Sequence, residues 1–94
     1  MTQLKTYRPV GHLDGFNAES HQQKLLALLA DDTTSIDIDM SALDYLSSAG
    51  LQVLLETAKA ARAKGGKVAL ISPRPSVLEV LQIVGFDKIL NVRA

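Results

Sequence analysis

The sequence has no cysteine and no tryptophan, and its aromatic residues are two tyrosines and two phenylalanines. Without cysteine the chain can form neither disulfides nor a thiolate, which agrees with a reducing compartment, and we expect the cytoplasm. Ten basic and ten acidic side chains cancel, so no basic surface for nucleic acid or an anionic membrane is expected. No apolar run is long enough to span a bilayer. Residues 1–9 lack the apolar core of a secretory signal peptide.

The sequence also has few candidates for metal-binding or catalytic side chains. The two histidines, His12 and His21, have no third histidine or cysteine near them in the sequence, so no metal site is expected. No set of nucleophile, base and orienting group stands out, which argues against an enzyme and against a cofactor. The composition, 47% hydrophobic and 21% charged over 94 residues, is that of one small globular domain covering residues 1–94.

Strand-like and helix-like segments alternate along the chain. Expected strands are 4–10, 35–40 and 67–71, and expected helices are 18–30, 48–64 and 76–84, followed by a turn and a last short strand or helix. Segments 11–15 and 41–46 are expected to be a turn and a loop. This order predicts an α/β fold with about four strands in a largely parallel or mixed sheet, and three or four helices mainly on one face. Pro9 suits an edge strand.

The second helix carries the most information. Glycines 65 and 66 should end it, and Ser48 or a neighbour should cap its start, as Asn17 should cap the first helix. Its expected buried stripe consists of Leu51, Leu54, Leu55, Ala58 and Ala61.

Two hydroxyls, those of Ser47 and Ser48, stand where this helix begins, one loop beyond the end of a strand. Capping alone accounts for a serine here and stabilises a helix by about 1 kcal/mol. The same position also suits a phosphate, because the first backbone N–H groups of a helix lack intrahelical partners and the helix dipole is positive there. Spacing favours capping over regulation.

Four segments in order resemble the STAS domain family of anti-sigma factor antagonists. They are GHLD at 11–14, IDMS at 38–41, YLSSAGLQVLL at 45–55 and GGKVALISPRPSVLEVLQIVGFDKIL at 65–90. They resemble, respectively, the family's Gly-x-Leu-Asp turn, its Asp-Leu-Ser strand end, its Asp-Ser-Ser-Gly-Leu helix start and its closing strand and helix. The resemblance is strongest over residues 10–92. Family members usually have a two-stranded start, so a strand is expected to be missing before Gly11 or supplied by a partner chain.

The resemblance implies a regulatory binding protein and not an enzyme. Family members of this type bind an anti-sigma factor, a serine kinase of the histidine-kinase-like ATPase fold, when they are unphosphorylated. The kinase phosphorylates them, and a PP2C-type phosphatase removes the phosphate. Phosphate adds −1.5 to −2 charges and three acceptor oxygens, so it can disrupt an interface by bulk, desolvation and repulsion.

The resemblance places the phosphorylated serine just before the motif's glycine, a position that is Ala49 in this chain. Ser48 is the first candidate for phosphorylation and Ser47 the second, and a binding module that is not phosphorylated stays open. The resemblance also implies a partner-binding surface, whose residues are Asp14, Asp39, Ser47, Ser48, Ala49, Gly50 and Gln52. For Asp14 and Asp39 the alternatives are a turn former and a solvated strand residue. The alternative function is a STAS subunit that binds the ATPase of a lipid-transport ABC transporter.

Overall fold

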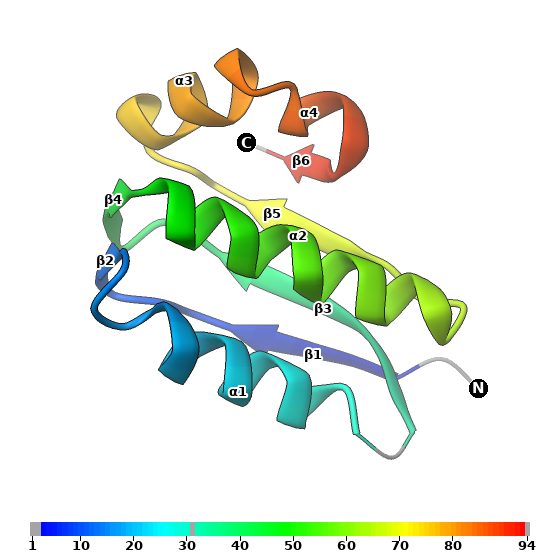
Figure 1. The fold of residues 1–94 in the computed structure, drawn as a ribbon. Coiled ribbons are helices and arrows are strands. Elements are labelled where there is room, and N and C mark those ends of the chain that lie inside the picture. Colours follow the sequence, from blue (N-terminus) through cyan, green and yellow to red (C-terminus); the bar gives the residue numbers. More distant parts are fainter. Residues whose placement is uncertain (1–2, 31, 94) are drawn as a thin grey trace.

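The computed structural model describes residues 3–30 and 32–93, and Figure 1 shows the arrangement of their helices and strands. In chain order these are β1 (Gln3–Tyr7), β2 (Gly11–Leu13), α1 (Ala18–Leu28), β3 (Thr33–Asp39), β4 (Leu43–Leu46), α2 (Ser48–Ala63), β5 (Val68–Ile71), α3 (Pro75–Ile83), α4 (Phe86–Ile89) and β6 (Asn91–Arg93). The predicted α/β class is confirmed. The ends of the predicted domain 1–94 lie outside the described residues.

The main sheet has four strands in the order β1-β3-β5-β6, and every neighbouring pair is parallel. Helices α1 and α2 lie side by side in front of β1, β3 and β5, while α3 and α4 lie along the β5–β6 side (Figure 1). The prediction of four strands with helices mainly on one face is therefore confirmed, and the sheet is parallel and not mixed. Strand β1 is at an edge, as predicted, but it ends at Tyr7, and Pro9 lies in the loop beyond.

The core lies between the sheet and the helices. Alternate side chains of β3 and β5 point into it, because successive residues of a strand face opposite sides. The fully buried apolar side chains include Ile36, Ile38, Met40, Leu70, Leu25, Leu54, Val77 and Leu81. Burying one such side chain contributes about 1.5–3 kcal/mol, so this layer holds the helices in place.

Helix α2 is rotated relative to the predicted stripe. Leu54 and Ala61 are buried as expected, but Leu51, Leu55 and Ala58 are only half-buried. The other buried positions of the helix are Gly50, Val53 and Thr57. The rotation brings the small Gly50 against β2, an approach that a simple apolar stripe does not take into account.

Two short segments predicted as a turn and a loop are strands. Residues of β2 pair in parallel with β4 in a separate two-stranded sheet, with Leu13 opposite Leu46. In β4 the buried residues Leu43 and Leu46 flank two exposed ones, so the sequence lacks the alternation that identifies a strand. The described residues hold one strand, β1, ahead of Gly11, and a further strand from a partner stays a prediction. This small sheet fixes the loop after β2 beside the start of α2.

Candidate partner-binding surface at the start of helix α2

Ser47 is the N-cap of α2. Its Oγ accepts a hydrogen bond from the Gly50 backbone N–H at 3.3 Å, and its carbonyl accepts one from Leu51 N–H at 2.9 Å. Its own N–H donates to the Leu13 carbonyl at 3.0 Å. Ser47 therefore satisfies a free donor of the helix start and ties that start to β2.

Ser48 is the first residue of α2 and is exposed. Within residues 3–30 and 32–93 no side-chain hydrogen bond engages its hydroxyl. The helix behind it is 16 residues long, so the positive end of a sizeable dipole and the free N–H groups of the first turn lie next to this hydroxyl. Its position combines access from solvent with an environment that favours negative charge.

Gly50 is buried, and its hydrogen atoms face the end of β2. A Cβ at this position would lie 2.5 Å from the Leu13 carbonyl oxygen and 2.7 Å from Leu46 Cδ1. Only glycine permits this approach without a shift of the backbone. We therefore do not include Gly50 in the proposed partner-binding surface. Its function in the structure is close packing.

The other predicted positions around the helix start differ in their access. Ala49 is half-buried and Gln52 is exposed. The Gln52 amide donates to Glu56 Oε1 at 2.8 Å, one helical turn further on. Gln52 thus lies on the outer face of α2, where a partner can reach it.

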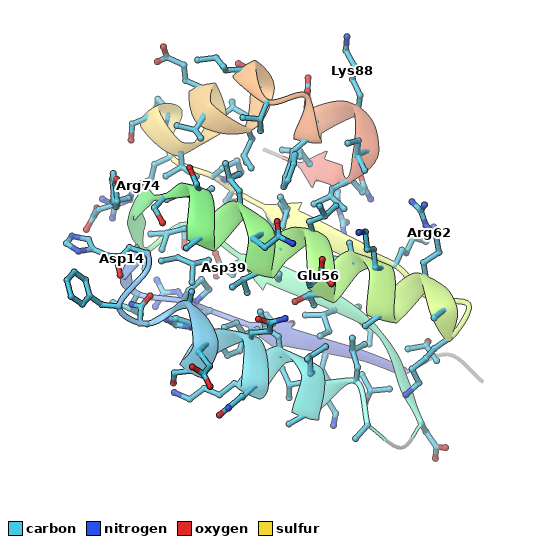
Figure 2. The ribbon with its side chains drawn as sticks, in the orientation of Figure 1. Asp14, Asp39, Glu56, Arg62, Arg74 and Lys88 are labelled. Atoms are coloured by element: carbon cyan, nitrogen blue, oxygen red, sulfur yellow. The ribbon has the colours of Figure 1, made fainter. Side chains whose placement is uncertain are left out.

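Asp14 lies in a tightly hydrogen-bonded turn between β2 and α1. Its Oδ1 accepts from the Phe16 N–H at 3.0 Å, and its own N–H donates to Asn17 Oδ1 at 2.9 Å. The Asn17 amide also donates to the His12 carbonyl at 2.7 Å. Asn17 was predicted to cap α1, but its side chain makes no cap hydrogen bond, because these bonds direct it back into the turn. These hydrogen bonds hold Asp14 in place, at the left of Figure 2.

A hollow of about 420 Å³ separates this turn from the start of α2, and it is lined by Asp14, Gly15, Phe16, Tyr45 and Ser47. The Phe16 side chain is fully exposed, and that of Tyr45 is 54% exposed. Asp14 and Ser47 were predicted from the sequence as surface residues, but neither aromatic residue was. Two features of the sequence could have pointed to them: the chain has few aromatic residues, and Phe16 lies among polar turn residues.

Asp39 lies apart from this hollow, at the end of β3. Its Oδ1 accepts from the Ser41 N–H at 3.0 Å, and its Oδ2 is 3.5 Å from Arg8 Nε. These groups lower the pKa of the Asp39 carboxyl, chiefly through the backbone hydrogen bond from Ser41, with the charge of Arg8 as a smaller cause. The structure thus brings Asp14 and Ser47 together at the hollow, with Ser48 next to Ser47 in the chain. Asp39 belongs to a different cluster.

Two classes of site have no candidate within residues 3–30 and 32–93. No group of three or more histidine, aspartate or glutamate side chains is placed to hold a metal ion there. The same residues contain no helix with the length and hydrophobicity needed to cross a membrane.

Comparison with known proteins assigns the chain to a family. The model of the STAS domain matches residues 2–94. BtrV of Bordetella bronchiseptica, which is assigned by name to the anti-sigma factor antagonists, is 38% identical over 82 residues, which are 87% of this chain and 71% of BtrV. An anti-sigma factor antagonist from Mycobacterium paratuberculosis has a similar structure, with a TM-score of 0.83, 25% identity and coverage of 94% of this chain and 74% of that one. Unphosphorylated SpoIIAA, an anti-sigma factor antagonist, has a TM-score of 0.81 at 24% identity, with 95% of this chain and 78% of that one covered. The chain belongs to the STAS domain family.

Proposed function

We propose that this chain is an anti-sigma factor antagonist whose binding is switched off by phosphate on Ser48. In the unphosphorylated form it binds an anti-sigma factor, a serine kinase of the histidine-kinase-like ATPase fold, and a PP2C-type phosphatase restores that form. Two observations support the proposal: the relationship to BtrV at 38% identity, and an exposed hydroxyl at the positive end of α2. The second observation carries the choice of residue.

Ser48 is a better kinase substrate than its neighbours. A kinase must surround the hydroxyl it modifies, and Ser48 is exposed and unengaged, whereas the Ser47 Oγ is half-buried and accepts the capping hydrogen bond from Gly50. Phosphorylating Ser47 would therefore disturb the cap, at a cost of about 1 kcal/mol. Ala49 has no hydroxyl. Ser48 thus replaces the serine that the family motif places one residue later.

Phosphate on Ser48 need not unfold the domain. The dianion would stand among free N–H groups of the first turn of α2, an environment that stabilises negative charge. At a packed interface it would instead act through its bulk and through the desolvation of its charge. A loss of about 3–4 kcal/mol would weaken the complex a few hundred-fold.

The proposal is tested by mapping the phosphate. The purified chain is incubated with ATP and the serine-kinase anti-sigma factor of its own organism, and the phosphopeptides are identified by mass spectrometry. We expect phosphate on Ser48, no incorporation into Ser48→Ala, and undiminished incorporation into Ser47→Ala. Phosphate on Ser47 would refute the choice of residue. Binding of the kinase without phosphate on either serine would indicate a module that is not phosphorylated.

The transporter alternative is not proposed. The 38% identical relative and the two structures described above carry names of anti-sigma factor antagonists and not of transporter subunits. An antagonist of this kind works where its sigma factor does, so we place the protein in the cytoplasm. Co-purification with a transporter ATPase, unaffected by Ser48→Glu, would overturn this preference.

A further inference from the structure

Two of the four aromatic side chains face solvent on the same small hollow. Tyr7 and Phe86 are half-buried and pack against the core, whereas Phe16 and Tyr45 are exposed and both line the hollow beside Ser47. An exposed phenylalanine gains nothing for the fold of its own chain. Aromatic anchors are, however, the side chains that most often dominate the energy of a protein–protein interface.

The backbone around this hollow is held in place before any partner arrives. The turn that carries Phe16 is held by the hydrogen bonds of Asp14 and Asn17. Tyr45 lies in β4, which pairs with β2, and its ring meets the His12 ring edge-on at a centroid distance of 5.9 Å. Because this backbone is already ordered, filling the hollow of about 420 Å³ costs mainly the rotamer freedom of the exposed Phe16 side chain.

The charge at its rim is not balanced. On this end of the molecule Asp39 pairs with Arg8, and Asp44 pairs with Arg74. Among the residues that the structure describes, Asp14 has no lysine or arginine at ion-pair distance, and its Oδ2 is 3.9 Å from His12 Nδ1. A cation brought by a partner would supply the missing charge.

We propose that this hollow receives an apolar side chain of the anti-sigma factor, and that a lysine or arginine of the same partner lies against Asp14. The inference rests on the proposed function and adds to it the chemistry of the partner's contact segment. The apolar side chain packs between the rings of Phe16 and Tyr45. Ser47 lines the same hollow, so the phosphate on the adjacent Ser48 would lie at the border of this contact, where its bulk and hydration oppose close packing.

The experiment measures binding of the anti-sigma factor to four forms of the full chain by calorimetry. For Phe16→Ala we expect an affinity about 30-fold lower, the loss typical of a central aromatic anchor. Asp14→Asn keeps an oxygen for the Phe16 N–H but removes the charge. It should weaken binding about fivefold and flatten its dependence on salt. The control is Ile89→Ala, which removes another exposed apolar side chain (52% exposed) from α4, and it should leave the affinity within twofold.

The outcomes separate this inference from the proposed function. If the wild-type chain binds and Phe16→Ala binds equally well, the hollow is not the contact, and the proposed function stands. If the wild-type chain binds no anti-sigma factor, both fail. Sedimentation of the chain alone tests a different occupant, because a dimer that Phe16→Ala dissociates would assign the hollow to a second copy and overturn the inference. Thermal unfolding of Phe16→Ala should be unchanged, since the Phe16 side chain is fully exposed.

Discussion

Replacing Gly50 with alanine should destabilise the protein, although alanine is the better helix former. The added Cβ would lie 2.5 Å from the backbone oxygen of Leu13 and 2.7 Å from Leu46 Cδ1, and a backbone atom cannot move aside as a flexible side chain can. Overpacking of this kind costs about 1–3 kcal/mol. The helix propensity of alanine returns at most about 1 kcal/mol. Because the contact involves backbone, we expect a cost at the upper end of this range, about 3 kcal/mol. The net loss is then about 2 kcal/mol, or about 8–16 °C in Tm.

Urea unfolding of Gly50→Ala, followed by circular dichroism, measures this loss. Gly15→Ala is the matched control, because nothing beyond the adjacent residues lies within 4 Å of a Cβ built at Gly15 and its φ is not positive. That control should be neutral or stabilised by about 0.4–1 kcal/mol through the unfolded state. If Gly50→Ala were as stable as Gly15→Ala, the close approach of α2 to β2 described above would be wrong.

Two further predictions concern the cap of α2 and the half-buried His21. Ser47→Ala should lower the free energy of unfolding by about 1 kcal/mol in urea titrations, and Ser48→Ala should change it by less than about 0.5 kcal/mol; equal losses would contradict the assignment of the cap. Burial lowers the pKa of His21, whose Nδ1 is hydrogen-bonded to the Tyr7 hydroxyl at 2.6 Å, and the charge of Lys24 lowers it further. The unfolded chain therefore takes up a proton first, so stability should fall as pH falls through 6.5 and level off below the pKa of the folded state. An NMR titration in which the His21 midpoint lies above 6.5 would contradict this.

Most of the fold could be predicted from local patterns. The alternation of Ile36, Ile38 and Met40 identified β3, and the apolar spacing of Leu25 and Leu29 identified α1. These segments bury one continuous face, so their pattern is visible without knowledge of their neighbours. Strands β2 and β4 could not be predicted, because each has three or four residues and pairs only with the other, at positions 32 or 33 residues apart in the chain. A strand that is stabilised by such distant pairing need not show an alternating hydrophobic pattern in its own sequence.

The candidate site was predicted in part. Ser47 and Ser48 stood out because hydroxyls at a helix start have a defined chemistry, and Asp14 stood out through the family motif. Only the structure shows that Ser47 caps the helix while Ser48 is exposed. This difference depends on how α2 is rotated against β2. Phe16 was missed because an aromatic residue in a turn is ordinarily assigned to the core, and only its exposure shows otherwise.

The most direct test of the account is the affinity of the anti-sigma factor for two forms of this chain, one unmodified and one carrying phosphate on Ser48, measured side by side by calorimetry. We predict that the phosphate weakens binding a few hundred-fold, about 3–4 kcal/mol, while circular dichroism shows both forms equally folded. Affinities within a few-fold of each other would contradict the account, since the exposed hydroxyl at the start of α2 would then control no interface.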